Sequence, residues 1–157
     1  MDDPADHAVR LAGVADAEQI GRLLHDFNSE FDEPTPGPEP LARRAAYLLA
    51  GGHATILLAG NGPDGLAVLR FRPAIWSEAL ECYLAELYVA PAQRRRGLGR
   101  ALMLAAMQLA RERGADRMDL GTGETDHAAR ALYESLGFSN RERGSDGPLA
   151  YFYERAL

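Results

Sequence analysis

The stretch that decides the fold reads Glu86-Leu-Tyr-Val-Ala-Pro-Ala-Gln-Arg-Arg-Arg-Gly-Leu-Gly-Arg100. An apolar strand runs into Pro91, three arginines follow, and Gly97-Leu98-Gly99 opens a helix. The first turn of a helix leaves its N–H groups without backbone partners, and the helix dipole adds partial positive charge there. Glycines let an anion approach the backbone closely, and arginines supply charge-assisted hydrogen bonds. The stretch therefore predicts a phosphate or pyrophosphate site.

Two other interpretations of this stretch stay open on the residues alone. Arg94–Arg96 would also fit a solvated basic cluster beside a tight glycine turn. Gly97-Leu98-Gly99 begins the GxGxxG pattern of dinucleotide folds, and Asp119 lies near the distance of a ribose-binding acid. The third small position of that pattern is Leu102, which is too large for close packing of a helix on a strand. A nicotinamide site is therefore disfavoured.

Short apolar runs with turn residues at their ends predict the strands. Gly60–Gly65 (GNGPDG) has the turn chemistry of a hairpin and joins two of these runs. The predicted strands are His7–Leu11, Thr55–Ala59, Leu66–Phe71, Glu81–Val89, Arg117–Leu120 and Leu149–Tyr153.

Apolar residues at helical spacing predict the helices. The first is expected to begin at Asp16, where Asp16 and Gln19 would form a capping box, and to be broken by Asp32–Pro40 (DEPTPGPEP). Strands that first pair as a meander and then alternate with helices indicate a mixed α/β fold, with one sheet covered by helices. The other helices are expected from Leu41 to Leu49, from Gly97 to Arg113 and from Ala128 to Leu136.

The composition fits one domain spanning all 157 residues. No apolar run approaches the roughly 20 residues of a membrane helix, and the acidic start MDDPADHA lacks the order of a signal peptide. A formal net charge of −6 disfavours a nucleic-acid partner. Cys82 is the only cysteine and is interpreted as a small buried hydrophobe, and no histidine has the spacing of a metal site. We therefore expect a cytoplasmic protein with no membrane contact and no metal.

At this point the sequence resembles the GNAT acetyltransferases. Their acyl-CoA signature, Q/R-x-x-G-x-G/A after a strand of the type ELYV-x-P, is matched by Arg94, Gly97 and Gly99 behind Glu86–Pro91. The second motif of the family, A-x-x-L-Y-x-x-x-G-F, is matched between Ala129 and Phe138. The resemblance covers about Thr55 to Phe138 closely, and it implies a splayed, mostly antiparallel GNAT-like sheet flanked by about four helices.

The resemblance also implies a cofactor and its contacts. Acetyl-CoA would serve as acyl donor and lie between the strands Glu81–Val89 and Arg117–Leu120. The strand residues Leu87, Tyr88 and Val89 would contact the cofactor, and the backbone groups of Leu87 and Val89 would pair with the pantetheine arm like an added strand. The amides of Arg95, Arg96, Gly97, Leu98, Gly99 and Arg100 would hold the pyrophosphate, with Arg94 as the first residue of the signature.

Two residues are candidates for proton transfer during acetyl transfer to an amine. Tyr133 lies near the edge of the apolar stripe of its helix, and the resemblance places it beside the CoA sulfur as a general acid. Glu86 is a carboxylate inside an apolar strand, where an ionised group is costly unless it faces a cleft or a partner. In many relatives an acidic residue near this position accepts the ammonium proton. For both residues a purely structural role stays open.

The remaining candidates concern the helix start and the acceptor. Many relatives carry Asn where this chain has Asp126, which is expected to cap the last helix through Ala129 and is included among the cofactor-binding candidates. The expected activity is N-acetylation of a primary amine of a small molecule or peptide, with a homodimer allowed. The alternative is a non-catalytic acyl-CoA-binding sensor or interaction module. The resemblance places the acceptor pocket at the first two helices, their loop and the connection Pro73–Glu78, whose aromatic and acidic residues would suit a cationic amine: Phe27, Phe31, Glu30, Asp32, Glu33 and Trp76.

Overall fold

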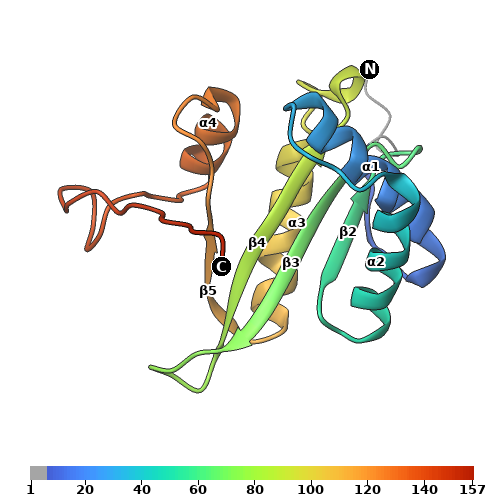
Figure 1. Cartoon of the computed structure of the whole chain (residues 1–157). Coiled ribbons are helices and arrows are strands. Elements are labelled where there is room, and N and C mark those ends of the chain that lie inside the picture. Colours follow the sequence, from blue (N-terminus) through green and yellow to red (C-terminus); the bar gives the residue numbers. More distant parts are fainter. Residues whose placement is uncertain (1–6) are drawn as a thin grey trace. The chain divides into compact units, whose positions relative to one another are not determined.

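The computed structural model describes residues 7–157, which divide into two compact units, residues 7–120 and Gly121–Leu157 (Figure 1). The first unit contains the sheet and three of the α-helices, and the second contains one α-helix followed by the C-terminal segment. The phosphate-site stretch quoted above lies within the first unit.

The sheet has five strands in the order β1-β2-β3-β4-β5. The first four strands pair antiparallel with their neighbours, whereas β4 and β5 are parallel. A parallel pair needs a crossover connection, and helix α3 (Leu98–Glu112) supplies it. The prediction of a mixed, mostly antiparallel sheet is therefore confirmed. The strands are β1 (Val9–Leu11), β2 (Thr55–Ala59), β3 (Gly65–Pro73), β4 (Leu80–Val89) and β5 (Ala115–Leu120).

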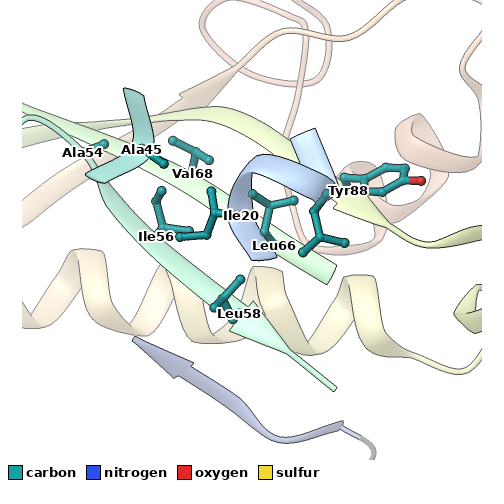
Figure 2. Packing of buried hydrophobic residues seen from close by; sticks show 9 residues of the cluster. Ile20, Ala45, Ala54, Ile56, Leu58, Leu66, Val68 and Tyr88 are labelled. Atoms are coloured by element: carbon teal, nitrogen blue, oxygen red, sulfur yellow. The ribbon is translucent and has the colours of Figure 1, made fainter. Parts of the chain in front are cut away.

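Helices cover both faces of this sheet. Helices α1 (Ala17–Glu30) and α2 (Pro38–Ala50) pack on one face, and α3 packs on the other (Figure 1). Alternate residues of a strand point to opposite faces, and the central strands are apolar on both. Figure 2 shows Ile20 of α1 among side chains of β2 and β3, all of them buried. The core on this face comprises Ile20, Leu23, Ala45, Ala54, Ile56, Leu58, Leu66, Val68 and Tyr88.

Helices α1 and α2 touch through their backbones. A Cβ added to Gly21 would lie 2.6 Å from the amide nitrogen of Ala42, closer than real contacts allow. Glycine at this position is therefore what permits the close crossing of the two helices. The crossing fixes the position of α1, whose last residue, Glu30, proves important for the site.

The second unit contains helix α4 (His127–Ser135). The carboxylate of Asp126 accepts a hydrogen bond from the Ala129 amide at 3.2 Å, which confirms the predicted cap. The predicted strand Leu149–Tyr153 is wrong. Arg141 and Leu149 form an isolated bridge, and the Ala150 amide donates to Asn140 at 2.8 Å. Beyond this bridge the segment makes no strand pairing, so residues 151–153 form no strand in the described chain.

The predicted capping box at Asp16 is also wrong. Asp16 precedes α1 but makes no side-chain cap, because its carboxylate accepts hydrogen bonds from Arg10 at 2.8 and 2.9 Å and from the Gly13 amide at 2.9 Å. These contacts lower the pKa of Asp16 to about 2. The other predicted elements are found within a few residues of their expected bounds. Among the described residues, none of the helices is long and apolar enough to cross a bilayer.

Candidate cofactor and active site

Strand β4 contains an extra residue opposite β3. Leu69 pairs with Leu84 and Val68 pairs with Glu86, so Ala85 has no counterpart and forms a β-bulge. Facing residues of an antiparallel pair lie on the same face of the sheet. Val68 belongs to the core beneath α1 and α2, and Glu86 therefore lies on that face.

Leu84 lies on the other face. A Cβ at Gly65 would meet Leu102 of α3 at 3.1 Å, so Leu69, which shares the face of Gly65 by alternation, faces α3. Its partner Leu84 does the same. Without the bulge, Leu84 and Glu86 would share one face, and the Glu86 carboxylate would be directed at α3. The bulge thus directs a carboxylate to the face that carries α1 and α2.

The bulge also marks the point where β4 loses one neighbour. Strand β5 pairs with β4 from Leu80 to Leu84, and beyond this point no strand of the described chain continues the pairing on that edge. The Ala90 amide donates to Asp64 at 2.8 Å, on the β3 side. Because backbone groups alternate in direction along an antiparallel strand, Leu87 and Val89 direct theirs away from β3. Two residues thus present backbone groups at an open edge.

Tyr88 lies between these two residues and has a different environment. Its side chain is 4% exposed and belongs to the core, where its ring stacks on Phe27 with a centroid distance of 5.1 Å. Figure 2 shows it at the end of the row of core side chains. Its backbone groups point to β3, where it faces Leu66. At the end of β4, Leu87 and Val89 therefore line the open edge, while the buried side chain of Tyr88 attaches the strand to the core.

Glu86 is a half-buried carboxylate beside this edge. Burial raises its pKa above the ordinary value, and the charge of Arg70 opposes part of that effect. A raised pKa brings the carboxylate closer to the pH range in which a general base both exists ionised and binds a proton well. The environment of Glu86 is therefore suited to proton exchange.

Helix α3 begins directly after the arginines. Gly97 is its N-cap with a φ of 84°, and no side chain caps the helix there. Arg95 also has a positive φ, of 62°. Within the helix, the amides of Leu98 and Gly99 have no acceptor, since the first turn has no preceding carbonyls. Uncapped amides beside exposed Arg95 and Arg96 fit the pyrophosphate of a CoA molecule.

Arg94 is held differently from the arginines that follow it. Its terminal nitrogens donate to the Glu30 carboxylate at 2.7 and 2.5 Å, and its Nε donates to the carbonyl of Val89 at 2.9 Å. Arg94 is predicted to bind the cofactor, and these contacts tie its guanidinium to α1 and β4. Its partner Glu30 is a residue that the family resemblance places in the acceptor pocket.

Tyr133 and Asp126 lie together in the second unit. The Tyr133 ring meets Phe138 edge to face at a centroid distance of 6.1 Å. Tyr133 is 9% exposed, and burial, with a smaller effect of Asp126, raises the pKa of its phenol to about 12. The phenol therefore keeps its proton at any physiological pH, as a proton donor must.

The residues expected to form the acceptor pocket are separated by the structure. Phe27 and Phe31 meet edge to face at 5.5 Å near the end of α1. Trp76 is 95% exposed in the hairpin that precedes β4, at the opposite end of that strand from the arginines. Among residues 7–157, His, Cys, Asp and Glu form no cluster of three or more that could hold a metal ion.

Comparisons with known proteins agree with this geometry. The model of the acetyltransferase (GNAT) family matches residues 20–138. A crystal structure from Arthrobacter sp. FB24 assigned to the acetyltransferases superposes with a TM-score of 0.87, at 42% identity, over 99% of this chain and 100% of that one. This chain belongs to the GNAT acetyltransferase family, and the predicted family and fold are confirmed.

Two curated relatives are similar over most of the chain. Mycothiol acetyltransferase of Thermobispora bispora is 33% identical over 144 residues, which are 88% of this chain and 43% of that protein. Thialysine N-epsilon-acetyltransferase of Caenorhabditis elegans is 25% identical over 79% of this chain and 78% of its own length. The chain thus spans less than half of the first relative, and the two relatives carry names with different acceptors.

Proposed function

We propose that this chain, acting as one domain, transfers an acetyl group from acetyl-CoA to a primary amine by direct attack of the amine on the thioester. The observation that carries the proposal is the bulge at Ala85, which opens one edge of β4 and turns Glu86 toward α1 and α2. The donor would lie along the open edge. The amine would reach it from the face that bears the carboxylate.

Each part of the donor has a candidate partner. The pantetheine amides would hydrogen bond to the backbone groups of Leu87 and to the amide of Val89 at the open edge, since the Val89 carbonyl already accepts a hydrogen bond from Arg94 Nε. The pyrophosphate would bind the amides at the start of α3, with Arg95 and Arg96 as nearby cations. Acetyl-CoA supplies an activated acetyl thioester, and the chain supplies its orientation.

The chemistry then needs two proton movements. Glu86 would accept a proton from the ammonium form of the acceptor, directly or through a water molecule. The free amine attacks the thioester carbon, so that a C–N bond forms and the C–S bond breaks. The thiolate of CoA would take a proton from Tyr133, and the second amine proton restores the phenol. The raised pKa of Glu86 supports its role as a base, and the raised pKa of Tyr133 keeps the phenol protonated at neutral pH.

The acceptor is proposed to be a small molecule or a peptide with a primary amine. The relatives do not narrow this further, because their names point to different acceptors. The acetyl-CoA-dependent release of free thiol should be measured with a panel of diamines, amino acids, aminoglycosides and short peptides. Release with any amine supports the proposal. Binding of acetyl-CoA without release from the whole panel would favour the sensor alternative, and binding of NAD in place of CoA would overturn the assignment.

A further inference from the structure

A polar link joins helix α1 to the loop that precedes α3. Glu30, the last residue of α1, accepts hydrogen bonds from both terminal nitrogens of Arg94, at 2.7 and 2.5 Å. The two residues lie 64 positions apart in the sequence. A guanidinium and a carboxylate joined by two parallel hydrogen bonds form a strong pair of fixed geometry. The contact therefore ties two distant segments to each other.

The same guanidinium is held by two more groups. Its Nε donates to the carbonyl of Val89 at 2.9 Å, and its carbon lies 5.7 Å from the centre of the Tyr88 ring. The Tyr88 ring in turn stacks on Phe27 of α1. The side chains of Arg94 and Glu30 are 39% and 28% exposed, so water screens the pair only in part. Contacts from α1 and from the end of β4 thus converge on Arg94.

The loop that follows needs such support. Arg95 has a φ of 62°, a left-handed conformation that is strained for a residue with a Cβ. A conformation of this kind persists when the surroundings impose it. Arg94 directly precedes Arg95, and the amides that follow are those that would bind pyrophosphate. Fixing Arg94 in place therefore fixes the start of the strained segment.

We propose that Arg94 is a positioning residue: its pairing with Glu30 holds the loop in the conformation that binds acetyl-CoA, and α1 is the anchor. The proposal rests on the proposed function in one respect, that this loop binds the CoA phosphates. It differs from a direct contact of Arg94 with the phosphates, in which Glu30 would compete for the guanidinium.

The two roles predict opposite effects of removing Glu30. If Arg94 bound phosphate itself, Glu30→Ala would free the guanidinium and remove a negative charge near the anion, so acetyl-CoA would bind as well as before or more tightly. If the pair positions the loop, the same change weakens binding although it removes a repulsive charge. The sign of the change in affinity therefore separates the two roles.

The experiment is a double-mutant cycle read by titration calorimetry with acetyl-CoA. The variants are Glu30→Ala, Arg94→Ala and the double variant, with Glu18→Ala as a control of equal charge at the other end of α1. We expect each single change to weaken binding roughly three- to tenfold, as for a partly exposed bidentate pair, and the double variant to be no weaker than Arg94→Ala. Unchanged or tighter binding by Glu30→Ala overturns the proposal.

Hydrogen exchange without ligand keeps this test separate from the proposed function. The amides of Arg94 and Ala101, which donate to the carbonyls of Pro91 and Gly97 on either side of this loop, should exchange faster in Glu30→Ala and Arg94→Ala than in the parent and in Glu18→Ala. Equal exchange in all four proteins overturns the positioning role. If the parent itself binds no acetyl-CoA, the proposed function fails, while the exchange rates still decide whether the pair orders the loop.

Discussion

The two places that carry chemistry in this protein are built in different ways. At the end of β4 and the start of α3 the main chain makes the site, through an open strand edge, a left-handed Gly97 and uncapped amides. On α4 a single side chain, the buried phenol of Tyr133, carries the proposed role. The first place should therefore fail when its backbone conformation changes, and the second when one functional group is removed.

The largest effect should come from a substitution at Gly97, where the main chain forms the proposed binding site. Gly97→Val forces a β-branched residue into a φ of 84°, which costs more than the roughly 1–2 kcal/mol of an ordinary side chain. Because the amides of α3 would no longer point at the phosphates, the rise in Tm caused by acetyl-CoA should vanish. Thermal unfolding with and without ligand measures this.

Gly114 offers a matched control at the other end of the same helix. Its φ is 86°, and open space surrounds the position of an added Cβ. Gly114→Val should lower the Tm of the free protein by a similar amount and leave the ligand-induced rise intact. Equal loss of that rise in both variants would mean that Gly97 acts through stability alone.

The second largest effect should come from Tyr133, where a single side chain carries the proposed role. Tyr133→Phe removes the phenol proton while leaving the ring, so kcat should fall by about 10- to 10³-fold, the range expected around general acid catalysis. The affinity for acetyl-CoA should stay unchanged. Steady-state kinetics with the best amine, combined with calorimetry, measures both. Since the phenol pKa is about 12, the parent should show no loss of rate from phenol ionisation near neutral pH. An unchanged kcat would leave Tyr133 a structural residue.

Glu86→Gln should give an effect that depends on pH. Burial raises the pKa of Glu86, so kcat/KM of the parent should rise with pH through an ionisation above the ordinary value of 4.5. The variant should be slowest relative to the parent near neutrality and approach it at high pH, where free amine is abundant. Glu81→Gln, on the same strand and paired with Arg72, should give a profile parallel to the parent. An equal loss at every pH for Glu86→Gln would exclude the base role.

The same substitution has a consequence for stability with a definite sign. Because the folded-state pKa of Glu86 is raised, the folded chain binds this proton more tightly than the unfolded chain does. The stability that this tighter proton binding contributes is fully present below the unfolded-state pKa and is lost as the pH rises through the folded-state pKa. Glu86→Gln should have a higher Tm than the parent at neutral pH and the same Tm below about pH 4, the ordinary range of glutamate. If the parent and Glu86→Gln have equal Tm values at both pH values, burial does not raise the pKa of Glu86.

The smallest effect should come from Asp126. Asp126→Ala removes the hydrogen bond to the Ala129 amide, which should cost about 1 kcal/mol of helix stability. Asp126→Asn keeps a capping oxygen and should cost only a fraction of this. Thermal unfolding of the two variants tests the cap. If Asp126→Ala unfolds as the parent does, the cap contributes nothing to stability.

How far the sequence predicted the molecule depends on how local each feature is. The strand Glu81–Val89 and the helix after Gly97 were predicted within a residue of their bounds, because apolar runs, Pro91 and the glycines act on their immediate neighbours. The cap at Asp126 is equally local and was correct. The predicted cap at Asp16 is wrong because the Asp16 carboxylate accepts hydrogen bonds from Arg10 on β1.

The features that sequence reasoning missed depend on distant partners. The ion pair of Arg94 with Glu30 joins residues 64 apart, and neither residue type indicates the other. The bulge at Ala85 cannot be seen in an apolar run, since it exists only as a mismatch with β3. A carboxylate inside an apolar strand was nevertheless a signal for an irregular position, and it led to Glu86.

The extra residue at Ala85 makes the number of residues along β4 part of the design of the site. If the bulge were lost without a change in chain length, Glu86 would slip by one residue against β3, and its side chain would turn toward α3. An insertion in the hairpin of residues 74–79 lies before the ladder and leaves every face unchanged. A lineage that keeps this chemistry is therefore free to lengthen the chain in the hairpin before β4, while at the bulge a slip of one residue against β3 exchanges the inside of the sheet for the outside.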